Sequence, residues 1–85
     1  MSELAYDYNI VEPKIRNVLY SALGQHLAIG TEEVDDGKVF VKVIAESFNG
    51  MKAKDRQARV WHALESLGSD AHAVSFVLAF GTDEV

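Results

Sequence analysis

The sequence FNGMKAKDRQARVWHALESLGSDAH, from Phe48 to His72, determines the interpretation of the whole chain. Asn49-Gly50 predicts a turn into a helix whose first residues are basic. Gly68 predicts the end of that helix, because glycine adopts a positive φ without steric cost. The buried stripe of this helix is predicted from apolar residues at helical spacing: Val60, Leu64 and Leu67. His72 then stands at the start of an apolar run.

A helix and a hairpin are predicted before this stretch. The helix opens at Glu12-Pro13, since a proline fits the first turn, and ends near His26. A strand at Leu27–Val34 follows, and its charged residues favour a sheet edge. The Asp35-Asp36-Gly37 turn leads back into the clearest strand, Lys38–Glu46. The odd-numbered residues of that strand are mostly apolar and are expected to pack against the helices.

The last predicted strand is His72–Phe80. Both of its faces are apolar, which favours a central position in the sheet. The order is therefore helix, strand, strand, a helix that can break near residue 55, and strand. This order predicts an α+β fold in which a three-stranded sheet carries its helices on one face. Residues 1–11 are expected to form a flexible tail, and residues 12–85 a single domain.

Composition and charge restrict the classes of function. A chain of 85 residues without cysteine has no disulfide, no thiol nucleophile and no thiolate metal site of its own. This usage fits a reducing compartment, and we expect a cytoplasmic protein. Residues 1–11 lack the basic run of a signal peptide, and no apolar run approaches the ~20 residues of a membrane span. The net charge of −5 disfavours nucleic acid, although a local basic segment remains.

At this point the chain resembles the BolA-like family. The resemblance depends on Phe48-x-Gly50, Arg56, Val60 and His72-Ala73 in this order and spacing, and it covers roughly residues 12–85. It implies an α-β-β-α-α-β domain similar to the class II KH topology. Two positions depart from the family pattern. Arg56-Gln57-Ala58 stands where the family has Arg-His-Arg, and the Thr31–Gly37 loop, from which the family draws a second cluster ligand, has neither His nor Cys.

The resemblance implies an accessory role in iron–sulfur cluster assembly or trafficking. His72 would donate one ligand to a [2Fe–2S] cluster shared with a monothiol glutaredoxin and glutathione. The chain would hold no cofactor alone. A nitrogen ligand in place of a thiolate raises the potential of such a cluster. The alternative for His72 is a strand-capping histidine that is hydrogen-bonded to the backbone.

The basic segment is a second candidate site. Lys52, Arg56 and Arg59 share a helix side by their spacing, and with Lys54 and Trp61 they could contact an acidic partner or nucleic acid. Because the implied topology is KH-like, the main alternative function is a transcriptional regulator that binds DNA or RNA. The alternative without a binding function is that these residues form a solvated helix face. His26 and His62 are better explained as exposed helix residues.

Catalysis has little support in the sequence. There is no nucleophile beside a base, no glycine-rich phosphate loop and no carboxylate pair in an acid–base setting, so we expect no enzyme. A third interpretation of the function is an interaction module that has this fold and takes no part in iron–sulfur cluster binding.

Overall fold

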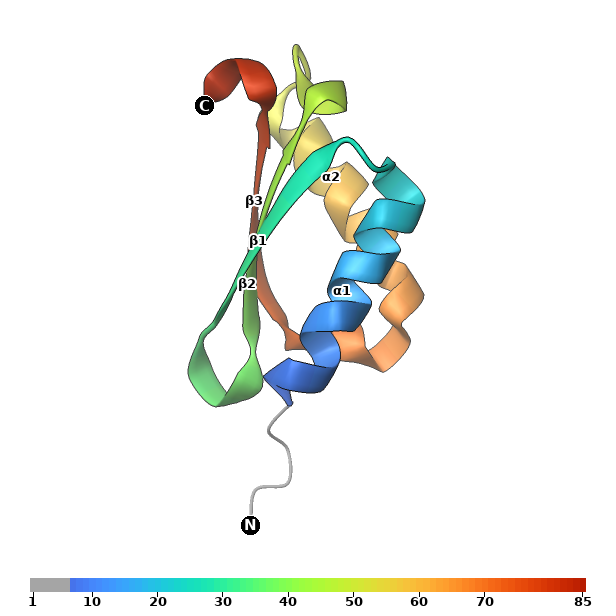
Figure 1. Ribbon diagram of the computed structural model, residues 1–85, viewed down its shortest axis with the longest axis vertical. Coiled ribbons are helices and arrows are strands. Elements are labelled where there is room, and N and C mark those ends of the chain that lie inside the picture. The colour runs from blue at the N-terminus through green and yellow to red at the C-terminus, as the bar shows by residue number, and fades with distance from the viewer. Residues whose placement is uncertain (1–6) are drawn as a thin grey trace.

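The computed structural model describes residues 7–85, with only the backbone of Asp36, and its helices lie on one face of a three-stranded sheet (Figure 1). The expected α+β architecture is therefore confirmed. The regular elements are α1 (Tyr8–Leu23), β1 (Leu27–Glu33), β2 (Val39–Ala45), α2 (Ala53–Leu64) and β3 (Val74–Gly81). A 3₁₀ segment, Glu65–Ala73, connects α2 to β3 in place of a third α-helix.

Helix α1 begins four residues before the predicted Glu12. The side chain of Asp7 caps it by accepting a hydrogen bond from the backbone N–H of Asn9 at 3.0 Å. Val11, expected in the tail, is instead buried in the core. The prediction failed because Pro13 was taken as the first turn, whereas this proline lies inside the helix. The expected tail otherwise falls on residues 1–6, outside the described residues.

The end of α1 also differs from the prediction. The helix stops at Leu23, and Gly24 follows with a φ of 95°, so the helix does not reach His26. Residues with a side chain rarely adopt that φ, whereas glycine does so without steric cost. Gly24 therefore allows the chain to leave the helix and turn at this point. His26 is consequently an exposed residue of the turn before β1.

Strands β1 and β2 form the predicted antiparallel hairpin around Asp35–Gly37. In β2 the odd-numbered residues are all buried against the helices, and the even-numbered ones are half-buried on the other face. This alternation follows from the period of two along a strand. The order β1-β2-β3 places β1 at an edge, as predicted.

Strand β3 lies at the other edge and not in the centre of the sheet, so that prediction is wrong. It pairs parallel to β2, which leaves its other side without a strand. A bulge shifts the register, because Val39 pairs with Val74 and Phe40 with Phe76, so that Ser75 has no partner. Val74 and Val77 therefore both face the core, although they lie three residues apart. The second apolar face of β3 is exposed.

Helix α2 is continuous from Ala53 to Leu64, without a break near residue 55. Val60 and Leu64 are fully buried, as their spacing predicts. Gly68 has the expected positive φ of 63°, but it lies within the 3₁₀ segment and not directly after α2. Among the described residues, no helix is long and apolar enough to cross a membrane.

Candidate functional site

His72 is exposed at the end of the 3₁₀ segment, two residues before β3 begins. Its neighbour Ala73 is completely buried and anchors the backbone at this point. No described residue makes a hydrogen bond or an ion pair with the imidazole of His72. The alternative of a strand-capping histidine therefore has no contact to support it within residues 7–85. Within residues 7–85, neither ring nitrogen is engaged by another residue.

The surroundings of His72 are polar but contain no ready metal site. Two residues before it, Asp70 forms an ion pair with Lys14 of α1, with Nζ and Oδ2 3.0 Å apart. Because Val74 pairs with Val39, the start of β3 lies at the same end of the sheet as the Asp35–Gly37 turn (Figure 1). No group of three or more His, Cys, Asp or Glu residues that could hold a metal ion occurs within residues 7–85. His72 can thus supply one ligand to a metal.

The basic segment divides into exposed and buried residues. Lys52, Lys54 and Arg59 are exposed along α2. Lys52 is the N-cap residue of α2, and its side chain makes no capping hydrogen bond. Lys52 and Lys54 therefore lie close to the positive end of the helix dipole, together with the acidic Asp55 of the first turn. This arrangement favours an anionic partner at the start of α2.

Arg56 does not belong to the exposed group. It lies on the buried side of α2 and is only 8% exposed. Its Nε donates to the carbonyl of Met51 at 3.0 Å, and its Nη1 donates to the carbonyl of Ala79 and to the carboxylate of Glu84. A partner cannot reach this guanidinium without breaking those contacts. The prediction that Arg56 shares an exposed helix side with Lys52 is corrected, because position 56 is one turn before buried Val60.

The partner of Arg56 is held in its charged form. The pKa of Glu84 is lowered, first by the hydrogen bond from the backbone N–H of Gly81 and then by the Arg56 side chain. Asn49 joins the same region, because its Oδ1 accepts from the backbone N–H of Asp83 at 3.1 Å. The ion pair of Arg56 with Glu84 and the hydrogen bond of Asn49 with Asp83 therefore connect the start of α2 to residues 83 and 84.

Trp61 is half-exposed and is tied to the sheet through one intermediate residue. Its Nε1 donates to Oε1 of Gln57 at 3.1 Å, and Nε2 of Gln57 donates to the carbonyl of Val77 at 2.7 Å. Gln57 thus connects Trp61 to β3. The indole is oriented by these contacts and keeps 36% of its surface exposed.

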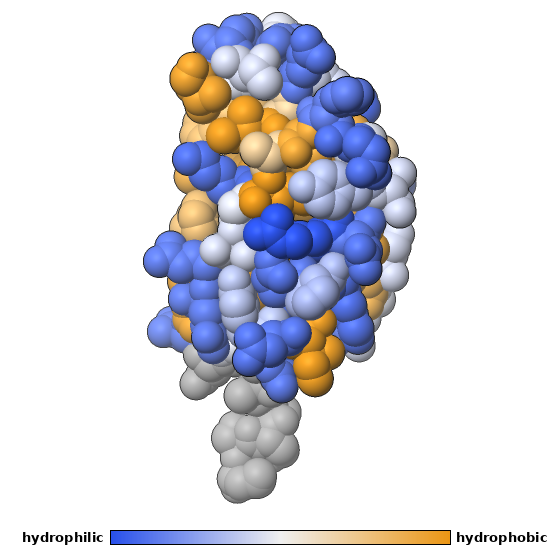
Figure 2. All heavy atoms as spheres, in the orientation of Figure 1, coloured by the Kyte–Doolittle hydropathy of each residue, from blue (hydrophilic) through white to orange (hydrophobic). Residues whose placement is uncertain are grey.

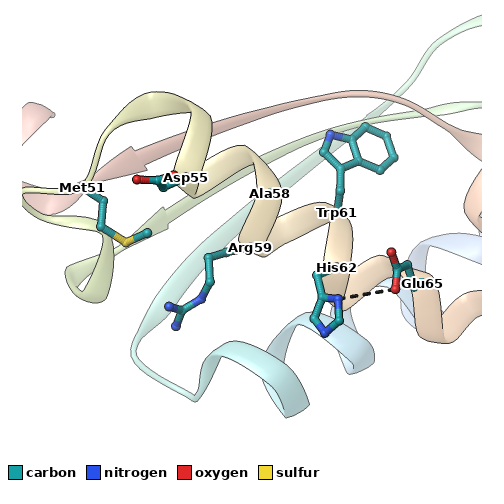
Figure 3. Close-up of a pocket in the computed structure, with 7 residues that line it drawn as sticks. All are labelled: Met51, Asp55, Ala58, Arg59, Trp61, His62 and Glu65. Carbon is teal, nitrogen blue, oxygen red and sulfur yellow. Dashed lines mark ion pairs between the residues drawn. The ribbon is translucent and has the colours of Figure 1, made fainter.

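A shallow groove runs along the exposed side of α2 (Figure 3). Arg59 and His62 project to one side of the helix and Trp61 to the other, and Met51 closes the end near the start of the helix. His62 Nδ1 lies 3.4 Å from Glu65 Oε1, and both side chains are strongly exposed. Arg59 and Trp61, two of the residues predicted for partner binding, both line this groove, from opposite sides of α2. Asp55, His62 and Glu65 were not predicted as members.

The structure separates His72 from the start of α2. Arg56 contacts Ala79 near the end of β3, whereas His72 precedes the first residue of that strand. The five residue-to-residue steps from Val74 to Ala79 span about 17 Å at ~3.3 Å per residue. A partner that touches both His72 and Lys52 therefore has to cover most of the length of β3.

A comparison with protein-family models, with curated proteins and with solved structures finds no match to this chain. The assignment of a function consequently depends on the residues of the chain and on their geometry.

Proposed function

We propose that this chain is a BolA-like accessory protein for iron–sulfur cluster assembly or trafficking. It pairs with a monothiol glutaredoxin, and His72 donates one ligand to a [2Fe–2S] cluster whose other ligands are the glutaredoxin cysteine and glutathione. The observation that carries the proposal is the exposed imidazole of His72, which has no partner among residues 7–85.

The residues that carry the resemblance to the BolA-like family differ in their burial and contacts, and this difference supports His72 as the ligand. Phe48 and Val60 are fully buried, Arg56 is buried and hydrogen-bonded, and Gly50 has a φ of 80°. Each of these four residues therefore has a role in folding. His72 has none among the described contacts, so it is the residue of this set that is free to serve a partner.

The chemistry needs only one ligand from this chain. A neutral imidazole is a common metal ligand near physiological pH. The Asp35–Gly37 turn lies at the same end of the sheet but provides no His or Cys. We therefore expect His72 to be the only ligand that this chain donates to the shared cluster. Loss of the His72 imidazole should abolish the contribution of this chain to the cluster.

The test mixes the chain with a cluster-loaded monothiol glutaredoxin and records visible absorption and circular dichroism. The native chain should change both spectra. His72→Ala should leave the glutaredoxin spectra unchanged, because no other imidazole replaces it.

His26→Ala and His62→Ala are the matched controls, since both histidines are also exposed. Each control should behave as the native chain does. An identical spectral change with His72→Ala would refute the ligand assignment. Binding of the glutaredoxin without any spectral change would instead support an interaction module that has no cluster role.

The second candidate function is binding of DNA or RNA by the exposed cations of α2. It is favoured by Lys52, Lys54 and Arg59 at and beyond the uncapped start of the helix, with Trp61 nearby as a stacking surface. Binding should weaken steeply as salt rises and should be lost in Lys52→Glu/Arg59→Glu. Arg56 is left unchanged in this test because its replacement would damage the fold. Binding that is insensitive to both salt and the double substitution would rule out this function.

A further inference from the structure

The side of the sheet that faces away from α1 and α2 is not covered by any described part of the chain (Figure 1). We call it the outer sheet face. Its central and β3 portion is formed by Phe40, Lys42, Ile44, Phe76, Leu78 and Phe80. Phe76 is 52% and Leu78 39% exposed, which places both among the most exposed large apolar residues of the described chain. Contact of this apolar surface with water is unfavourable.

The aromatic residues of this face are ordered as a group. The rings of Phe40 and Phe76 lie 4.6 Å apart between centroids, and Nζ of Lys42 lies 5.8 Å from the centroid of Phe80. The bulge at Ser75 brings Phe76 beside Phe40 on this side of the sheet. In Figure 2 hydrophobic side chains gather in the upper half of the molecule, and some show along the left margin, on the outer side of the sheet.

Side chains of the helices already occupy both edges of the sheet. At β1, Nη1 of Arg16 donates to the carbonyl of Ile29 at 3.1 Å. At β3, Gln57 and Arg56 donate to the carbonyls of Val77 and Ala79. A partner that adds a strand would have to displace these donors. An occupant of the sheet therefore covers the outer face and does not extend the edge.

The charges on the outer sheet face indicate which kind of molecule binds to it. Lys42 of β2 and Glu32 of β1 both lie on it, and neither forms an ion pair with any residue within 7–85. A cation and a carboxylate beside apolar side chains make a surface complementary to itself. A nucleic acid would meet the carboxylate of Glu32 on this face as well as the cation of Lys42. We propose that two copies of this chain pack outer sheet face against outer sheet face, with Lys42 of each copy directed toward Glu32 of the other.

The outer sheet face is small for a protein–protein interface, which is typical of weak association. Seven residues at ~3.3 Å and three strands at ~4.8 Å give a face of about 23 by 14 Å, or roughly 320 Å². A standard stable interface buries about 800 Å² on each partner. The dimer is therefore in equilibrium with the monomer and forms as the concentration rises. It uses neither His72 nor the groove on α2, so it does not depend on the proposed function.

The first test follows the mass of the intact chain by sedimentation equilibrium over a wide concentration range. The native chain should approach twice the monomer mass, and Phe76→Ser should remain a monomer throughout. Ile10→Ser is the matched control, because Ile10 is 55% exposed but lies on α1, and it should dimerise as the native chain does. Circular dichroism verifies that each variant is folded. A native chain that stays monomeric at the highest concentration overturns the proposal.

The second test exchanges the two charges. Lys42→Glu gives a face with two negative charges, and Glu32→Lys gives a face with two positive charges, so each variant alone should be monomeric. An equimolar mixture should form a dimer, because every charge then meets its opposite across an interface in which both copies use the same patch. Lys54→Glu, which changes the same charge on α2, should not alter self-association. A mixture that stays monomeric, or a dimer that survives Lys42→Glu alone, overturns the pairing of the faces.

Discussion

Arg56 on α2 donates to the carboxylate of Glu84, 28 residues further along the chain, and so fastens the C-terminal turn to the start of the helix. Glu84 also accepts the backbone N–H of Gly81 at 2.9 Å. The cation that the sequence suggested for partner binding is thus used inside the molecule. Its two backbone acceptors, on Met51 and Ala79, extend the same connection to the loop before α2 and to β3.

Glu84→Gln should destabilise the fold in a pH-dependent manner. The pKa of Glu84 in the folded chain lies below its ordinary value of 4.5, owing first to the Gly81 N–H and then to Arg56. The ionised carboxylate therefore favours the folded state. Its contribution is complete above about pH 4.5, the unfolded value, and is lost as the pH falls through the folded value. The melting temperature of Glu84→Gln should lie below that of the native chain at neutral pH, and the difference should shrink in acid.

Asp83→Asn provides the control for this experiment, because Asp83 is adjacent and forms no ion pair with a described residue. Thermal unfolding of the three proteins, followed by circular dichroism from neutral to acidic pH, measures the effect. A difference between Glu84→Gln and the native chain that stays constant across this range would contradict the assigned role of the carboxylate.

Phe48→Ala should be strongly destabilising, although Phe48 belongs to the pattern that suggested a function. The side chain is completely buried, and its removal leaves a cavity that we expect to cost about 3–5 kcal/mol of unfolding free energy. Gly50→Ala should cost about 1–2 kcal/mol because of its φ of 80°. Urea titrations of both variants measure these losses. Native stability in Phe48→Ala would show that this part of the pattern serves a partner and not the fold.

The sequence predicted the parts of the fold that depend on local periodicity. The alternation in β2 and the spacing of Val60 and Leu64 each identified a buried face, because burial follows the period of an element. The position of β3 could not be derived in this way. An exposed apolar face and a buried one have the same composition, and only the tertiary arrangement leaves Phe76 in solvent.

The candidate site was only partly predictable for a related reason. His72 was selected through the resemblance to the BolA-like family, and it is exposed. Arg56 was assigned to the surface from its spacing to the cations Lys52 and Arg59, but its helical phase with Val60 was the stronger signal and places it inward. Glu84 and Asn49 were missed because their contacts with Arg56 and Asp83 join distant parts of the chain.

Tyr8→Phe should lower the stability of the fold, because Tyr8 in the first turn of α1 connects the helix to β1. The Tyr8 hydroxyl lies 2.8 Å from Oγ1 of Thr31, which in turn donates to Glu12 at 3.0 Å and so connects the helix to β1. Loss of this hydroxyl should lower the unfolding free energy by about 1 kcal/mol. Tyr20→Phe is the control, since Tyr20 is also half-buried and its hydroxyl has no partner in the described chain. Equal stability of the two variants would show that residue 8 does not pack onto the sheet.

Gly81→Ala and Gly30→Ala form a matched pair within the sheet, because both glycines lie in edge strands. A Cβ at position 81 would come within 2.3 Å of Asn49 Oδ1 and 3.0 Å of the Asn49 Cα, so the turn that holds Glu84 has to move. A Cβ at position 30 would meet only Lys42 Cβ, at an ordinary 3.9 Å. Gly81→Ala should therefore lower stability and weaken hydrogen-exchange protection at Gly81 and Asp83, whereas Gly30→Ala should leave both unchanged. Equal protection at these two amides in Gly81→Ala and in the native chain would mean that Asn49 and the C-terminal turn do not pack closely against Gly81.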